Sequence, residues 1–419
     1  MKAGDKVKLT LKDEIIDGIL MPSEDDYYFI KLDNGYNLGI SKRNVKDIKL
    51  LGQIKTEVVK VKSIKQTKGL PEISILHTGG TIASKVDYKT GAVKAQFKPE
   101  ELIEMFPEIK EIANINSRLI GNIMSENMNF DHYNLLAKEI EKEVKKGVKG
   151  VIITHGTDTL HYTSAALSFI LKGINIPIIL VGAQRSSDRG SSDAAINLIS
   201  ACVYISNTKD IGVRICMHKN TDDETNVILQ GVKARKMHSS RRDAFKSINE
   251  LPIAEVDYKN KKIKIIKQPK VYLEKLNLKL FKDVKIGLIK VRPGMCAKEF
   301  ENYKGYGGLI IEGTGLGHVP IEGTPENEKI LKILEKLSKT MIIVMTTQTI
   351  YGRVNMNVYS TGRILQDVGI LGSNLDMIPE TAYIKLAWLL SNYSMEESKK
   401  LYNENIVGEI SERSENVFI

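Results

Sequence analysis

From residue 72 onward, the sequence repeats one unit that strongly limits the possible folds: a short apolar run, a loop of small polar residues, and a stretch with helical periodicity. Three such apolar runs occupy residues 73–76, 151–153 and 176–181, and a helical pattern covers 131–146. Strands that are apolar throughout are typical of a parallel sheet covered on both faces by helices. Ligands of such sheets bind at the carboxyl edge of the strands, which is where these polar loops fall.

The same unit recurs near the C-terminus. Apolar runs lead into polar loops at residues 285–291, 307–312 and 341–345. Helical patterns cover 325–337 and 379–391, which predicts a second α/β lobe. We therefore expect a large lobe at residues 72–270 and a smaller C-terminal lobe at 271–419, with a lysine-rich hairpin near the connection between them.

The first fifty residues follow a different pattern, in which short alternating strands are separated by turn residues such as Asp33-Asn34-Gly35. Five strands in so short a stretch predict a small β-barrel of SH3-like or OB-like type at residues 1–51. Residues 52–71 lose the alternation, gain lysines and end in Gly69-Leu70-Pro71, which predicts a basic linker. Small barrels bind peptides, nucleic acids or other subunits, and the sequence does not choose among these partners.

The composition limits the broad class of the protein. The chain has 419 residues, of which 42% are apolar, so two or three globular units are expected. No apolar run reaches the roughly 18 to 20 residues that cross a bilayer, and the N-terminus lacks the apolar stretch of a signal peptide, so we expect a cytoplasmic protein that does not associate with membranes. The three cysteines form no CxxC pair and the seven histidines show no ligand spacing, so neither disulfides nor a metal site is expected.

The net charge of +10 is concentrated in three segments. Residues 51–70 carry +4, residues 233–246 carry +5, and residues 259–270 hold six lysines and no acid. Clusters of this kind favour a polyanionic partner such as a nucleic acid. Solvated lysines on a heat-adapted surface explain them equally well, so both interpretations stay open.

Two polar loops carry groups that are able to do chemistry: His77-Thr78-Gly79-Gly80-Thr81 and Thr154-His155-Gly156-Thr157-Asp158-Thr159. The two glycines of the first loop allow a tight turn beside Thr81, whose hydroxyl is a candidate nucleophile. A hydroxyl needs a base, and the second loop or a lysine of the basic segment is able to supply one. Each loop alone is equally consistent with an anion-binding turn or a helix start, and neither is a Walker or a dinucleotide-binding motif.

Taken together, the two loops resemble the two signature loops of the bacterial-type L-asparaginase and glutaminase family. Val181-Gly182-Ala183-Gln184-Arg185 is similar to that family's next strand end, and the match runs from about residue 72 to the C-terminus. The resemblance implies a two-lobed α/β amidase core with a parallel sheet. It also implies hydrolysis of a side-chain amide through a covalent acyl-enzyme.

The resemblance further implies catalytic roles. Thr81 matches the family's nucleophile, Thr157 matches the second catalytic threonine, and Asp158 matches the acid beside it. Tyr88 is similar to the family's flap tyrosine, although the loop between Thr81 and Tyr88 is shorter than usual.

The family's catalytic lysine lies ten residues before the second residue of a Phe-Lys-Ser motif. Here Phe245-Lys246-Ser247 places that lysine at Lys236, with Lys233 as the rival. The alternative is that the whole stretch is a basic surface loop.

Ser125-Glu126 resembles the pair that holds the α-carboxylate and α-amino groups of the substrate, and Gly156 is expected to bind substrate as well. Asparaginases usually carry Gln where Glu126 stands. The family also borrows an acid from a neighbouring subunit, which has no secure counterpart around residues 355–359.

A free-standing asparaginase does not need residues 1–71. The small barrel, basic linker and amidase core together resemble, over the entire chain, the D subunits of archaeal glutamyl-tRNA(Gln) amidotransferases, and the basic run at residues 239–245 favours this choice. In that family the D subunit hydrolyses glutamine and passes ammonia to an E subunit. The E subunit uses ATP and Mg to convert Glu-tRNA(Gln) to Gln-tRNA(Gln). The resemblance implies no cofactor in this chain, and a D-subunit homodimer within a heterotetramer.

Two alternatives remain open at this point. One is a stand-alone L-asparaginase with an appended β-barrel. The other is a non-catalytic RNA-binding scaffold, which the basic segments suggest.

Overall fold

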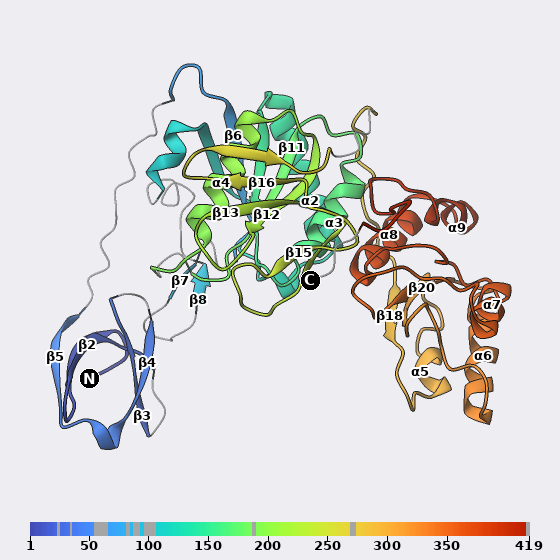
Figure 1. The fold of residues 1–419 in the computed structure, drawn as a ribbon, viewed down its shortest axis with the longest axis horizontal. Coiled ribbons are helices and arrows are strands. Elements are labelled where there is room, and N and C mark those ends of the chain that lie inside the picture. Colours follow the sequence, from blue (N-terminus) through green and yellow to red (C-terminus); the bar gives the residue numbers. More distant parts are fainter. Residues whose placement is uncertain are drawn as a thin grey trace.

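The computed structural model describes residues 1–22, 26–33, 36–53, 66–80, 84–86, 93–95, 106–186, 190–268 and 274–415. Thr81 and Tyr88 lie outside the described residues, as do residues 54–65 of the predicted linker and Asn34-Gly35 of the predicted hairpin turn. Figure 1 shows a small N-terminal sheet, a large lobe and a C-terminal lobe.

The N-terminal sheet contains the five strands that the alternation predicts. They are β1 (Asp5–Thr10), β2 (Ile15–Leu20), β3 (Tyr27–Lys31), β4 (Asn37–Ser41) and β5 (Asp47–Gln53). All pairs are antiparallel, in the order β4-β3-β2-β1-β5. Side chains such as Val7, Leu9 and Ile30 point inward and form a small apolar core of their own. The small β domain expected at the N-terminus is therefore confirmed.

The large lobe is built on an eight-stranded sheet in the order β17-β16-β13-β12-β11-β10-β6-β9. Its parallel strands are β6 (Glu72–His77), β9 (Asn114–Leu119), β10 (Gly150–Thr154), β11 (Pro177–Val181) and β12 (Gly212–His218). Three antiparallel strands extend it beyond β12, namely β13 (Thr225–Gln230), β16 (Ala254–Asp257) and β17 (Lys262–Ile265). The predicted parallel strands are thus confirmed, and the lysine-rich hairpin is the antiparallel edge of the same sheet.

Helices cover both faces of this sheet. On one face lie α2 (Phe130–Lys146) and α3 (Leu160–Ile170), and on the other lies α4 (Ala194–Asn207). The strands are apolar throughout because successive side chains enter the two cores alternately. Local signals set the limits of α2: the Asn129 side chain caps the backbone N–H of His132, and Gly147 ends the helix with a φ of 82°.

The C-terminal lobe has a three-stranded parallel sheet, β18 (Ile286–Lys290), β19 (Gly308–Gly313) and β20 (Ile342–Thr347). Its helices are α5 (Ala297–Glu301), α6 (Pro325–Leu337), α7 (Ser360–Asp367), α8 (Pro379–Asn392) and α9 (Met395–Tyr402). Helix α8 shares an apolar core with α3 of the large lobe, where the rings of Phe169 and Trp388 lie 5.5 Å apart. The α8 helix therefore joins the two lobes.

Three short elements complete the path to the site: β14 (Ala234–Lys236), β15 (Phe245–Ser247) and the 3₁₀ turn η4 (Ser125–Asn127). Strands β7 (Ser84–Val86) and β8 (Val93–Ala95) pair with each other. No helix within the described part of the chain is long and apolar enough to span a bilayer.

Candidate active site

Four loops meet at the carboxyl edge of the large sheet, because neighbouring parallel strands end there side by side. The loop after β6 bonds to the end of β10, where the backbone N–H and the hydroxyl of Thr78 both donate to the carbonyl of Thr154, at 3.1 and 2.9 Å. On the other side of that loop, the Ile123 N–H donates to the Thr78 carbonyl at 2.7 Å. The N–H of His155 donates to the carbonyl of Val181, which ends β11, at 2.9 Å. The polar motifs of the sequence therefore lie at one place.

Glycine is required where these loops touch. A Cβ on Gly80, whose φ is 81°, would lie 2.4 Å from the backbone nitrogen of Gly156. A Cβ on Gly156 would in turn lie 2.9 Å from Oγ of Ser125. Both distances are too short for a Cβ atom, so the two glycines allow the three loops to pack closely against one another. The position directly before Thr81 is thus next to the loop that holds Thr157.

Lys236 supplies the cation at this edge. It is the last residue of β14, and its Nζ donates to Oγ1 of Thr157 at 2.8 Å and to Oδ1 of Asp158 at 2.7 Å. The Lys236 side chain is only 9% exposed, whereas that of Asp158 is 68% exposed. A buried ammonium therefore bridges a buried hydroxyl and a carboxylate that remains open to solvent.

Lys233, the rival candidate, has another role. Its Nζ lies 2.8 Å from Oδ2 of Asp376 in the C-terminal lobe, without hydrogen-bond alignment, and both side chains are fully buried. Burial lowers the pKa of Lys233, and the charge of Asp376 opposes that shift. The structure therefore places Lys236, rather than Lys233, against Thr157.

Gln184 is a neighbour of Thr157 to which the sequence analysis assigns no role. The Thr157 hydroxyl lies 3.5 Å from Oε1 of Gln184, and the buried Nε2 of Gln184 has no hydrogen-bond partner within the described ranges. The loop after β11, which carries Gln184, is fixed by the buried carboxylate of Asp193. This carboxylate accepts hydrogen bonds from the backbone N–H groups of Gln184 and Arg185, both at 3.0 Å. The available signal was the position of Gln184 in the loop that follows an apolar strand, three residues after Val181.

Ser125 and Glu126 lie in η4, beside Gly156. Ser125 is buried, and its carbonyl accepts a hydrogen bond from the Thr159 hydroxyl at 2.6 Å, which ties η4 to the Thr157 loop. Glu126 is exposed. The structure thus brings Ser125, Gly156, Thr157, Asp158 and Lys236 together, with Glu126 next to them on the surface.

Two buried histidines, His77 and His155, form hydrogen bonds that hold the loops after β6 and β10 in place. The imidazole of His77 bonds to the hydroxyls of Thr154 and Ser117 at 2.8 and 2.7 Å, and that of His155 bonds to the Gly156 carbonyl and the Thr163 hydroxyl at 2.6 and 2.9 Å. Burial lowers the pKa of each to about 4. Both rings are therefore neutral at pH 7 and hold the loops through hydrogen bonds.

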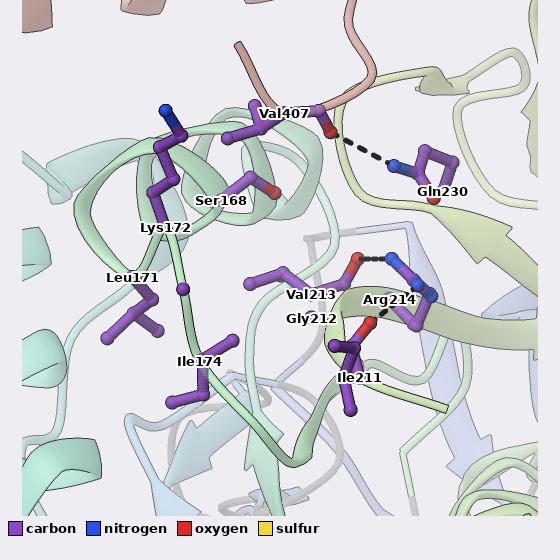
Figure 2. A pocket seen from close by; sticks show the side chains of 11 residues that line it. Ser168, Leu171, Lys172, Ile174, Ile211, Gly212, Val213, Arg214, Gln230 and Val407 are labelled. Carbon is purple, nitrogen blue, oxygen red and sulfur yellow. Dashed lines mark hydrogen bonds between the residues drawn. The ribbon is translucent and has the colours of Figure 1, made fainter. Parts of the chain in front are cut away.

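Figure 2 shows a cavity at the opposite edge of the sheet, between the end of α3 and the start of β12. Its volume is about 40 Å³, which suits water rather than a substrate. Its polar side chains are already used, since Gln230 donates to the Val407 carbonyl at 3.2 Å and Nε of Arg214 donates to Asp210 at 2.8 Å. This cavity has no part in the chemistry at the carboxyl edge.

Three known families match the chain. Residues 1–51 match the GatD N-terminal domain, residues 72–271 match the family described as Asparaginase, N-terminal, and residues 285–402 match the Glutaminase/Asparaginase C-terminal domain.

Curated relatives match over nearly the full length. A protein of Methanococcus maripaludis strain C5 is 46% identical over 98% of this chain and 99% of its own. Similar proteins of Archaeoglobus fulgidus and Sulfolobus acidocaldarius are 44% and 42% identical, over 97% and 98% of this chain and 95% and 92% of their own. All three are named as the D subunit of glutamyl-tRNA(Gln) amidotransferase.

Solved structures match the two α/β lobes. The thermostable L-asparaginase from Thermococcus kodakarensis is 29% identical and aligns with a TM-score of 0.73 over 81% of this chain and 99% of its own. L-asparaginase I from Vibrio cholerae is also 29% identical, with a TM-score of 0.71 over 82% of this chain and 100% of its own.

Proposed function

Because the chain belongs to the family of glutamyl-tRNA(Gln) amidotransferase D subunits, with an asparaginase-type amidohydrolase core, we propose that it hydrolyses glutamine with Thr81 as the nucleophile. Membership makes the chain an amidohydrolase that acts within a tRNA-dependent amidotransferase. The observation that carries the proposal is the contact of Lys236 with Thr157 and Asp158, in a loop whose Gly156 packs against Gly80, the residue before Thr81.

In this proposal the Thr81 hydroxyl attacks the side-chain amide carbon of glutamine, and its proton passes through Thr157 to Lys236 as Lys236 gives a proton to the Asp158 carboxylate. Backbone N–H groups of the Gly-Thr turns stabilise the oxyanion. The proton then moves to the amide nitrogen, which leaves as ammonia and yields an ester of Thr81. Water hydrolyses the ester, which releases glutamate and regenerates the hydroxyl. The 2.8 Å contact between Lys236 and Thr157 supports this relay.

The remaining site residues hold the α-groups of glutamine. In this proposal Ser125 and Gly156, which lie side by side, bind the α-carboxylate, and Glu126 and Asp158 offer carboxylates to the α-ammonium. Tyr88, whose position lies outside the described residues, would cover the nucleophile.

We further propose that the ammonia passes to an E subunit, which uses ATP and Mg to convert Glu-tRNA(Gln) to Gln-tRNA(Gln) in the cytoplasm. The names of the relatives support a complex with further subunits. A homodimer of this chain within a heterotetramer is the proposed assembly. We propose no cofactor for this chain, and its described residues contain no cluster of three or more His, Cys, Asp or Glu that is able to hold a metal ion.

The nucleophile is tested by Thr81→Ala in the assembled complex. We expect ammonia production from glutamine to be lost, because the variant lacks the hydroxyl that attacks the amide carbon in this proposal. An unchanged ammonia yield would favour the RNA-binding scaffold instead.

The coupling is tested by adding the E subunit and Glu-tRNA(Gln) to the purified chain. We expect poor glutamine hydrolysis by the isolated chain and a clear increase on addition. If the isolated chain hydrolyses asparagine freely and the addition changes nothing, the chain is a stand-alone L-asparaginase with an appended barrel.

A further inference from the structure

The hairpin that carries Lys236 is attached to the C-terminal lobe at both of its ends. Before β14, the Val232 carbonyl accepts a hydrogen bond from the Thr381 hydroxyl at 2.9 Å, and Lys233 pairs with Asp376. After β15, the Asn249 amide donates to the Asp376 carbonyl at 3.0 Å. The hairpin therefore contacts the large lobe through Lys236. Both of its ends are held by residues of the C-terminal lobe that lie more than 120 positions further along the chain.

Within β14 the side chains divide between the two lobes. Successive residues of a strand point to opposite sides, so Lys236 reaches Thr157 while its neighbour Arg235 points away from it. Nη2 of Arg235 lies 3.0 Å from Oε1 of Glu380, which sits in the first turn of α8. The residue next to the catalytic lysine is thus held by a carboxylate of the C-terminal lobe.

The same carboxylate approaches the other half of the site. Oε1 of Glu380 lies 3.8 Å from Nε2 of His161 in the first turn of α3, the helix that directly follows the loop with Thr157 and Asp158. Glu380 is only 7% exposed, and its Oε2 has no hydrogen-bond partner in the part of the chain that the structure describes. Burial acts to raise the pKa of Glu380, but the contact with His161 and the charge of Arg235 outweigh it and lower the pKa.

A buried carboxylate with one unpartnered oxygen is costly to remove from water, and apolar packing often replaces a whole buried ion pair without loss of stability. Its position suggests another use, since it contacts the strand that ends in Lys236 and the helix that begins after Asp158. Proton relay requires Lys236 Nζ to stay within hydrogen-bond reach of Thr157, and a displacement of about 1 Å is able to cost about 100-fold in rate.

We propose that Glu380 is a positioning residue of the amidase site, which acts through Arg235 to keep Lys236 directed at Thr157 and so makes glutamine hydrolysis depend on the placement of α8. The inference rests on the function proposed above, since it assigns Lys236 to proton transfer.

The test compares Glu380→Gln, Arg235→Gln and the double variant in the assembled complex with Glu-tRNA(Gln), with kcat and KM for glutamine as the readout. We expect each single variant to lower kcat by about 10- to 100-fold, with KM changed by less than about threefold. The double variant should have the same kcat as either single variant, because each single variant already breaks the same Arg235–Glu380 interaction. Arg235→Lys, which keeps the charge, should recover part of kcat.

The matched control is Asp210→Asn, which breaks the buried Arg214–Asp210 pair at the opposite edge of the sheet. It should lower the melting temperature and leave kcat near that of the parent. If Glu380→Gln fails to fold, Arg235→Gln tests the positioning role instead, because the Arg235 side chain is only half-buried. A kcat that falls less than about fivefold, or losses that add in the double variant, overturns the positioning role.

Lys236→Met separates this inference from the proposed function. If Lys236→Met abolishes hydrolysis and Glu380→Gln does not lower kcat, only the positioning role fails. If Lys236→Met keeps full activity, the proposed function fails and the inference fails with it.

Discussion

The two lobes carry the same arrangement, parallel strands that end in small polar loops, and use it differently. At the edge of the large sheet, the Thr157 hydroxyl meets the ammonium of Lys236. At the corresponding edge of the small sheet, the Thr347 hydroxyl donates to the Gly315 carbonyl at 2.5 Å, and the amide of Gln348 donates to the Glu312 carbonyl at 3.0 Å. The polar groups of the small lobe close their own loops, whereas those of the large lobe face a cation from a third segment, β14. A strand-and-loop pattern thus determines where polar groups gather. In the large lobe, a lysine from another segment of the chain is what distinguishes that edge from its counterpart in the small lobe.

The largest expected effect comes from removing that cation. Lys236→Met should lower kcat for glutamine hydrolysis in the complex by about 10²- to 10⁴-fold, since a side chain positioned for proton transfer contributes that much. Steady-state ammonia release measures it. Lys246→Met, on the partner strand of the same hairpin, is the control, since Lys246 bonds to the Lys219 carbonyl rather than to Thr157. Equal losses in both variants would mean that the hairpin needs charge rather than Lys236 itself.

Lys233→Met tests the opposite case, because this lysine lies just before β14 and should contribute to stability rather than to chemistry. It leaves the fully buried Asp376 without its cation, which should lower the free energy of unfolding by about 3 to 5 kcal/mol. Urea denaturation measures it. The double variant Lys233→Met with Asp376→Leu should recover most of the loss. If the double variant is as unstable as the single one, the ion pair is not the cause.

Acid should weaken the large lobe through His77 and His155. Each has a folded pKa of about 4 against about 6.5 when unfolded, so the unfolded chain binds more protons and stability falls as pH drops from about 6.5 to 4. The expected loss between pH 7 and pH 5 is about 2 kcal/mol per histidine. Denaturant unfolding at both pH values measures it, and His155→Gln should reduce the slope. A stability independent of pH across this range would show that these rings are not held neutral by burial.

The smallest effect is expected in the small lobe, from Thr347→Val. The loss of one hydroxyl and its bond to the Gly315 carbonyl should lower the free energy of unfolding by about 1 kcal/mol and leave kcat within about twofold. Thr157→Val makes the same chemical change in the large lobe and should instead lower kcat by about 100-fold. Thermal unfolding and ammonia release of the two variants, measured side by side, check the contrast. A matching loss of kcat in Thr347→Val would remove the distinction between the two edges.

The candidate site was predictable to the extent that it depends on neighbouring parallel strands. Thr157, Asp158 and Ser125 follow apolar runs or lie near the ends of such strands, and parallel strands end at one edge. The choice of Lys236 over Lys233 rested on the resemblance, because two lysines three residues apart look alike in sequence. Their difference comes from the fold, because Lys236 is the last residue of β14 and reaches Thr157, whereas Lys233 lies just before that strand and meets Asp376 of the C-terminal lobe.

By itself, the sequence determined the two α/β units, the small N-terminal β domain and the edge at which polar groups gather, because hydrophobic period and turn residues are local properties. Only the tertiary structure decided that three antiparallel strands extend the large sheet, that α8 packs on α3, and that Glu380 reaches both Arg235 and His161. The contacts of α8 and Glu380 join residues more than a hundred positions apart, and their energy depends on burial and distance rather than on any pattern along the chain.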